Sequence, residues 1–144
     1  MRGYQMNISK KIESLLLIIW TQALLATFGS LFYSEVMGYA PCEMCWYQRI
    51  LMYPLVIIYG VAILKKNIEI AIPGLILSGV GVCISLYHYG LQKIPAFQNS
   101  GGFCGEIPCN LQYVNYFGFI TIPFLAGAAF FIIICLHIVI LRTR

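Results

Sequence analysis

Charged residues are scarce in this chain of 144 residues: Asp, Glu, Lys and Arg make up 10% of it, against 60% for hydrophobic residues. None of these four residue types occurs in Ser14–Ser34, Ile50–Leu64, Ile70–Gln92 or Ile107–Leu141. A soluble protein of this size could not bury so much apolar surface, so the composition excludes a soluble globular domain. The chain also lacks internal repeats and dividing linkers, and we expect a single domain over residues 1–144.

The apolar segments are long enough to cross a membrane. About 20 apolar residues span a bilayer as a helix, because each residue rises about 1.5 Å and the hydrocarbon core is about 30 Å thick. The segment from Ile50 reaches this length when it is counted from Cys45. We therefore expect an all-α integral membrane protein, a four-transmembrane-helix bundle. Its helices are predicted near residues 14–33, 46–64, 70–91 and 117–141.

The first apolar segment must be distinguished from a cleaved signal peptide. Lys10 and Lys11 before it resemble the basic region of such a peptide. However, the apolar run is long, and no small-x-small cleavage site follows it. The pattern favours a transmembrane helix.

Basic residues are distributed unevenly between the two sides of the predicted bundle. Seven of the nine flank one side: Arg2, Lys10, Lys11, Lys65, Lys66, Arg142 and Arg144. Arg49 and Lys93 lie on the other. Because cytoplasmic loops are enriched in Lys and Arg, both termini are predicted to be cytoplasmic. Segments 34–45 and 92–116 then form two extracytoplasmic loops, and the net charge of +4 reflects this bias rather than nucleic-acid binding.

The six cysteines divide into two groups. Cys83 and Cys135 fall inside predicted helices, where a buried thiol acts as a small, inert apolar group. The other four lie in the outward loops: Cys42, Cys45, Cys104 and Cys109. Disulfides persist outside the cytoplasm, so these four predict two disulfides. Of the three possible pairings, the short spacings favour 42–45 and 104–109, and a bond between the pairs is a plausible transient.

Two structural roles compete with redox chemistry for these cysteines. Cys-x-x-Cys is a common zinc spacing. However, four residues, including Pro108, separate the second pair, and the loops face an oxidising compartment, so no metal is expected. Static disulfides are the second alternative. A Cys-x-x-Cys disulfide closes such a small loop that it restricts little of the unfolded chain, which suits a labile redox couple better than a structural bond.

The surroundings of Cys45 favour redox chemistry. The second helix is predicted to begin near residues 43–45, which places Cys45 in its first turn, where the helix dipole favours a thiolate. Arg49 follows four residues later, on the same helix face. A guanidinium there can stabilise the thiolate and donate to an oxygen that gains negative charge, such as a quinone carbonyl. The alternative is an arginine that only snorkels to the membrane surface.

Other residues near the outward side are weaker candidates. His88, flanked by tyrosines, can hydrogen-bond a quinone oxygen or move protons, but it can equally anchor the third helix at the interface. Gln48 can donate a hydrogen bond. The aromatic residues Trp46, Tyr47 and Tyr53 are expected in the aromatic belt at the membrane surface.

The chain resembles the bacterial disulfide bond formation protein B family (DsbB), and within it the short BdbC-like branch. The residues that carry the resemblance are Pro41-Cys42-Glu43-Met44-Cys45-Trp46-Tyr47-Gln48-Arg49-Ile50-Leu51-Met52-Tyr53-Pro54, His88, Gly29 to Glu35, and Phe117 to Phe124. The Cys-x-x-Cys with Tyr and Arg downstream is the specific part. The spacing of the second cysteine pair matches the short branch rather than the long members.

The resemblance implies a membrane dithiol:quinone oxidoreductase of the bacterial cell membrane. Cys42 and Cys45 are implied to exchange electrons with a quinone beside Arg49, with His88 near the ring. The second pair, Cys104 and Cys109, is implied to take electrons from an extracytoplasmic thioredoxin-like thiol oxidase (DsbA-like or BdbD-like). The short branch further implies menaquinone rather than ubiquinone. The expected role is support of disulfide bond formation in exported proteins.

Three other functions compete with this prediction. A protein similar to vitamin K epoxide reductase also joins thiols to a quinone in a four-helix bundle, but its thiol pair lies beside a late helix. A small exporter would want an ionisable residue at mid-membrane, whereas Glu13 and Glu35 only border a span. A non-catalytic scaffold with structural disulfides is the third alternative.

Overall fold

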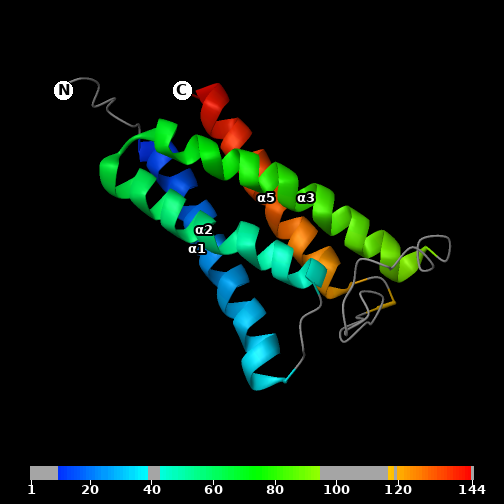
Figure 1. The fold of residues 1–144 in the computed structure, drawn as a ribbon. Helices are drawn as coiled ribbons and strands as arrows, with labels where there is room; N and C mark the ends of the chain where they lie inside the picture. The colour runs from blue at the N-terminus through cyan, green and yellow to red at the C-terminus, as the bar shows by residue number, and fades with distance from the viewer. Residues whose placement is uncertain (1–9, 39–42, 95–116, 119, 144) are drawn as a thin grey trace.

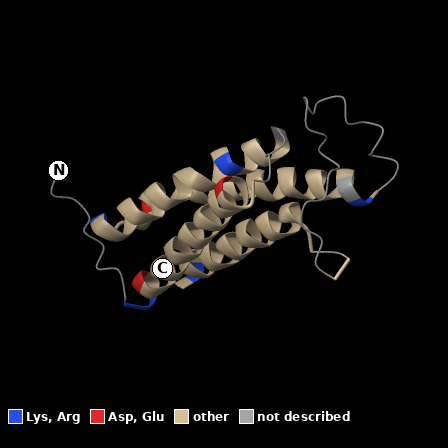
Figure 2. Cartoon of the chain, turned by 90° about the horizontal axis from the view of Figure 1, so that it is seen from below, with Lys and Arg blue, Asp and Glu red and all other residues tan. Residues whose placement is uncertain are grey.

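The computed structural model describes residues 10–38, 43–94, 117–118 and 120–143, and these ranges contain four long helices. They are α1 (Lys10–Leu31), α2 (Glu43–Lys65), α3 (Ile72–Lys93) and α5 (Ile122–Thr143). A π-helical turn, η1 (Phe32–Val36), extends α1, and a 3-10 turn, η2 (Ile68–Ala71), leads into α3. All four helices are long and apolar enough to cross a membrane, and Figure 2 shows how few charged residues they carry. The predicted four-helix membrane bundle is confirmed.

The helices pack in a ring. Each of α1, α2 and α3 contacts the next along the chain, and α5 contacts both α3 and α1. Figure 1 shows the start of α1, the α2–α3 junction and the end of α5 at one end of the bundle. Toward the opposite end α1 diverges from α3 and α5 in this view. The first residues of α2 and α5 lie at that opposite end.

The helix boundaries follow proline and left-handed residues. Pro73 and Pro123 lie in the first turns of α3 and α5, where the missing N–H breaks no helical hydrogen bond. The prediction that the fourth helix begins near residue 117 is wrong, because α5 begins at Ile122. Phe117 and Gly118 have φ values of 56° and 83°, which a right-handed helix excludes. The other three helices agree with prediction to within a few residues.

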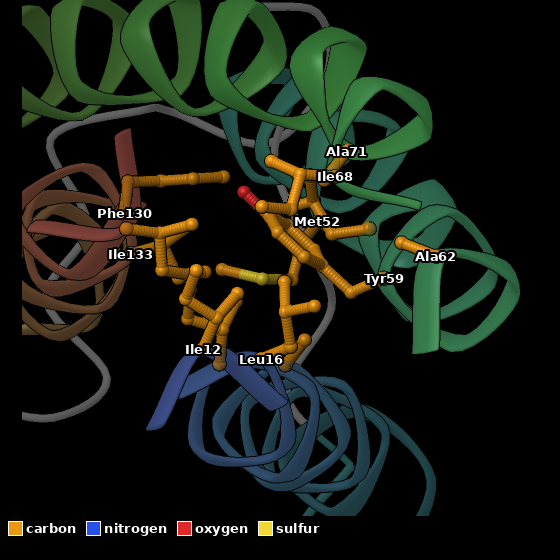
Figure 3. Packing of buried hydrophobic residues seen from close by; sticks show 13 residues of the cluster. Ile12, Leu16, Met52, Tyr59, Ala62, Ile68, Ala71, Phe130 and Ile133 are labelled. Atoms are coloured by element: carbon orange, nitrogen blue, oxygen red, sulfur yellow. The ribbon is translucent and has the colours of Figure 1, made fainter. Parts of the chain in front are cut away.

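Side chains from different helices meet in an apolar core. Leu16 of α1 and Tyr59 of α2 are fully buried, as are Phe130 and Ile133 of α5. Figure 3 shows the two α5 side chains directed toward Tyr59 and Met52 of α2, with α1 closing the cluster from a third side. Because lipid is as apolar as these side chains, close packing and interhelical hydrogen bonds hold such a bundle together.

Hydrogen bonds connect helices across this interior. Among them are the bonds from Trp20 Nε1 to the Val56 carbonyl (3.1 Å), from Gln22 Nε2 to the Ala129 carbonyl (3.1 Å), and between the Tyr59 hydroxyl and His137 Nδ1 (2.8 Å). Bonds of this kind contribute on the order of 1 kcal/mol each inside a bilayer. They fix α1 against α2 and α5, and α2 against α5, which sets the positions of the helices around the site described below.

Small residues on α3 allow its neighbours to approach closely. The predicted stripe of small residues is buried along its whole length: Gly74, Ser78, Gly81 and Ser85. The Tyr59 ring fills the space beside Gly74, and the Phe130 ring fills the space beside Gly81. The stripe therefore serves packing within the chain.

Replacing Gly81 by alanine is expected to lower the melting temperature of the purified protein in detergent. The new Cβ would lie 2.6 Å from the Phe130 ring, so α3 and α5 would have to separate. Such overpacking typically costs about 1–3 kcal/mol. Gly79→Ala is the matched control, since no heavy atom from elsewhere in the described chain lies within 4 Å of its Cβ and alanine favours a helix. Equal melting temperatures for the two variants, measured by circular dichroism, would contradict this packing.

Two cysteines differ from expectation in their burial. Cys83 and Cys135 lie within α3 and α5 as predicted, but both side chains are exposed on the outside of the bundle. On α3 the reason is geometric: Gly81 and Ser85 of the small-residue stripe take the inner face, which turns Cys83 outward. In a bilayer these thiols face lipid rather than the protein core.

Candidate functional site

A cavity of about 380 Å³ lies between α1, α2 and α5. Its volume falls within the range of small-molecule sites, roughly 300–1,000 Å³. The lining includes apolar groups from two helices, among them Leu25 and Ala26 of α1 and Leu125 and Ala126 of α5. Leu25 is 68% exposed and Leu125 is 42% exposed, so both also contribute to the outer surface of the bundle. The cavity is thus bordered by side chains that contact lipid in a membrane.

One face of α2 forms a wall of this cavity. Its lining residues are Cys45, Gln48, Arg49, Met52 and Tyr53. Their spacings of three and four residues place them on a single side of the helix. α2 begins at Glu43, as predicted, so Cys45 lies in its first turn. The structure therefore brings the predicted residues Cys45, Gln48 and Arg49 together at one cavity.

The Arg49 side chain is held in place by α1. Its Nε donates to Ser30 Oγ at 2.9 Å, and its Nη2 donates to the Ser30 carbonyl oxygen at 3.2 Å. The guanidinium carbon also lies 5.2 Å from the centre of the Trp46 ring, a distance that permits a cation–π contact. These contacts keep Arg49 at the cavity, in contrast to an arginine that snorkels to the membrane surface. Among the described residues, its other N–H groups have no hydrogen-bond partner and remain available to a ligand.

Gln48 and His88 form a buried pair. Gln48 Nε2 lies 3.2 Å from His88 Nδ1, and the two side chains are 5% and 1% exposed. With the Gln48 amide as donor, His88 Nδ1 accepts and the ring proton lies on Nε2. Gln48 lines the cavity, whereas His88 does not. The two candidates are thus adjacent, with His88 placed to position Gln48.

The four cysteines of the predicted relay are described only in part. Cys45 is half-buried and lines the cavity. The other three, Cys42, Cys104 and Cys109, lie outside the described residues.

Tyr53 differs from its predicted place. It was expected in the aromatic belt together with Trp46 and Tyr47, and those two are indeed exposed. Tyr53 instead lines the cavity, and its hydroxyl oxygen is buried without a hydrogen-bond partner among the described residues. The spacing of four from Arg49 to Tyr53 was the sequence signal for this position, because residues four apart share a helix face.

Two polar residues of α1 at the cavity were missed by sequence reasoning. Gln22 lines the cavity and donates to α5, and Ser30 lines it and accepts from Arg49. Gln22 lies within a segment free of charged residues, where a polar side chain is costly unless it finds a partner. That cost could have indicated from the sequence that Gln22 has a partner inside the bundle. The sequence gives no such indication for Ser30, since a serine near a helix end is common.

Comparison with known proteins gives a consistent result. The family model described as "Disulfide bond formation protein DsbB" matches residues 12–141. A probable disulfide formation protein of Oceanobacillus iheyensis is 65% identical over 139 residues, 96% of each chain. A probable disulfide formation protein C of Bacillus cereus is 50% identical over 94% of this chain and 98% of its own. The disulfide bond formation protein C of Bacillus subtilis is 49% identical over 80% of this chain and 83% of its own. No solved structure matches.

Proposed function

Since this chain belongs to the disulfide bond formation protein DsbB family and acts in disulfide bond formation, we propose that it is a membrane dithiol:quinone oxidoreductase. In this proposal it reoxidises an extracytoplasmic thioredoxin-like thiol oxidase (DsbA-like or BdbD-like). The electrons pass from that partner through Cys104 and Cys109 to Cys42 and Cys45, and then to a membrane quinone, with menaquinone favoured over ubiquinone.

The observation that carries the proposal is that Cys45 and Arg49 line the same wall of the cavity. A thiol in the first turn of α2 and a fixed guanidinium one turn further line the same cavity. Apolar side chains from α1 and α5 complete that cavity, and some of them reach the lipid-facing surface. This combination suits a ligand that is apolar, dissolves in lipid and carries oxygen atoms that accept hydrogen bonds.

The residues present fit a quinone. The apolar side chains can pack against its ring, and the unused N–H groups of Arg49 can donate to a carbonyl oxygen. A quinone bound there supplies an acceptor for two electrons and two protons. The guanidinium of Arg49 is placed to stabilise the Cys45 thiolate and would stabilise negative charge on a quinone oxygen. The low-dielectric surroundings strengthen both interactions.

The proposed relay consists of thiol–disulfide exchange steps. A thiolate of the reduced partner attacks the sulfur of Cys104 and releases Cys109; the second partner thiol then resolves this bond, so the partner leaves oxidised. One thiolate of the reduced Cys104/Cys109 pair then attacks Cys42 and releases Cys45 as a thiolate beside Arg49. The second thiol of that pair resolves the mixed disulfide, which closes the 104–109 disulfide again and leaves Cys42 and Cys45 reduced. The 42–45 pair then returns to its disulfide. Each cycle forms one disulfide in the partner and one quinol.

The relay also requires an orientation, which we take from the charge distribution. Most basic residues flank the end of the bundle that holds the α2–α3 junction and the end of α5. By the positive-inside rule, that end is cytoplasmic, and the start of α2 with Cys45 faces outward. This is the side on which a secreted thiol oxidase is found. Both chain termini are then cytoplasmic.

Anaerobic titration tests the proposal directly. The purified protein in detergent is mixed with a reduced thioredoxin-like thiol oxidase and with either a menaquinone or a ubiquinone analogue. We expect one quinol to form for each partner disulfide, with faster turnover for the menaquinone analogue. Quinol is followed by its absorbance, and partner thiols are followed by alkylation. A partner that stays reduced with every quinone would contradict the proposal.

A further inference from the structure

Trp46 makes a contact that an aromatic residue at the membrane surface does not need. It is predicted to belong to the aromatic belt, and its side chain is 52% exposed. The guanidinium carbon of Arg49, however, lies over its ring at 5.2 Å from the ring centre. A cation within about 6 Å of a ring face is attracted by the negative charge of that face, and Trp is the strongest aromatic partner. The contact therefore indicates a role beyond anchoring α2 in the membrane.

The ring lies in the direction in which Arg49 would leave the cavity. Trp46 precedes Arg49 by three residues, which places it about 4.5 Å nearer the start of α2 along the helix axis. Side chains of a helix tilt toward its N-terminus, so the Arg49 side chain extends over the turn that holds Trp46. In the orientation taken from the charge distribution, the outer membrane surface lies in the same direction. An arginine that snorkels to that surface would have to give up its contact with the ring.

Trp46 and Ser30 restrain the guanidinium in different ways. The two hydrogen bonds to Ser30 engage Nε and Nη2, on one edge of the planar group. The Trp46 ring instead contacts the flat face of that group. Bonds along one edge still allow the group to pivot about this edge, and a contact on its face opposes that motion. Arg49 lines the cavity and Trp46 does not, so the ring can influence a ligand there only through the guanidinium.

From this arrangement we propose that Trp46 is a positioning residue for Arg49: its indole face holds the guanidinium at the cavity, oriented to donate to a quinone oxygen. The inference rests on the proposed function and deepens it. A donor that is already in place loses little conformational freedom when the ligand binds. Removal of the ring should therefore weaken quinone binding, although Trp46 does not contact the quinone.

Binding to the oxidised protein tests this role without the redox reaction. The protein in detergent is titrated with a dimethylnaphthoquinone, and calorimetry gives the Kd. We expect Trp46→Leu to weaken binding about threefold to tenfold, which is the range of one cation–π contact. Trp46→Phe should recover part of this loss, because Phe retains a smaller aromatic face. Tyr47→Leu is the matched control and should bind as the wild type does, since Tyr47 is 48% exposed on the same helix and does not line the cavity. A wild-type Kd for Trp46→Leu would overturn the inference.

A fluorinated side chain separates the electrostatic contact from the filling of space. Tetrafluorotryptophan, incorporated at position 46 alone, has nearly the shape of tryptophan, but its ring face carries little negative charge. We expect its Kd to be weakened about as much as that of Trp46→Leu. If the fluorinated protein binds as the wild type does, the ring merely fills space, and the inference is wrong.

A double-mutant cycle shows whether the ring acts through Arg49. In the Arg49→Ala background, Trp46→Leu should cause no further decrease in kcat/KM for quinone, because the group that the ring positions is gone. A further decrease as large as in the wild-type background would contradict the inference. The proposed function fails separately: it is contradicted if the wild-type protein forms no quinol with any quinone, whatever the Trp46 variants do.

Discussion

Cys45→Ser is expected to abolish quinone-dependent oxidation of the partner while the helix bundle stays folded. Serine cannot form the disulfide with Cys42, and its hydroxyl does not ionise near neutral pH, so no electron pair can leave the protein at the cavity. We expect multiple-turnover quinol formation to fall by a factor on the order of 10³ or more, as for loss of other catalytic nucleophiles. Anaerobic quinol formation with a reduced thioredoxin-like oxidase measures this rate.

The variant should still perform half of the relay. Its 104–109 disulfide is intact in the proposed mechanism, so each protein should oxidise about one equivalent of partner and then stop. Cys83→Ser is the matched control, because Cys83 is exposed on the outer face of α3 and does not line the cavity. It should turn over at the wild-type rate. Wild-type turnover by Cys45→Ser would rule out a relay through the 42–45 pair.

The two cysteines in these experiments also show how far composition and spacing predict the structure. The absence of charge over long segments predicts the four helices, because few alternatives satisfy the backbone in lipid. The spacing of four predicts that Cys45 and Arg49 share a face of α2, since helix geometry is local. The burial of Cys83 was predicted wrongly, because the face that a helix turns inward depends on its neighbours. In α3 that face belongs to the small residues.

The residues that line the cavity could not be predicted from local patterns, because they too depend on how neighbouring helices pack. Ser30 and Arg49 are 19 residues apart, and their contact depends on how α1 lies against α2. The hydrogen bond of Trp20 holds α1 against α2, the bond of Gln22 holds α1 against α5, and neither follows from local sequence. The start of α5 was also missed, because a left-handed conformation at Phe117 is rare for a residue with a side chain. The contacts at the cavity therefore depend on packing between helices, which local sequence patterns do not predict.

Arg49→Ala is expected to impair the quinone step far more than the thiol step. The alanine removes the donor to the developing oxygen anion and the positive charge beside the Cys45 thiolate. A hydrogen bond to a charged group contributes about 1.5–3 kcal/mol. This predicts a decrease of roughly 10- to 100-fold in kcat/KM for quinone. The first equivalent of partner, oxidised by the 104–109 disulfide without quinone, should form at nearly the wild-type rate.

Two further substitutions separate charge from orientation at this site. Arg49→Lys keeps the charge but cannot reproduce the fork that bonds both Ser30 Oγ and the Ser30 carbonyl, so we expect partial recovery at best. Ser30→Ala removes only the bond to Nε and should reduce kcat/KM for quinone by a few-fold, within the range of one hydrogen bond. If kcat/KM for quinone increases in the order Arg49→Ala, Arg49→Lys, Ser30→Ala and wild type, this would support a guanidinium that is held in position by α1. If Arg49→Ala instead slowed the single-turnover thiol step as much as the quinone step, Arg49 would serve the fold or the partner, and the quinone would have to bind elsewhere.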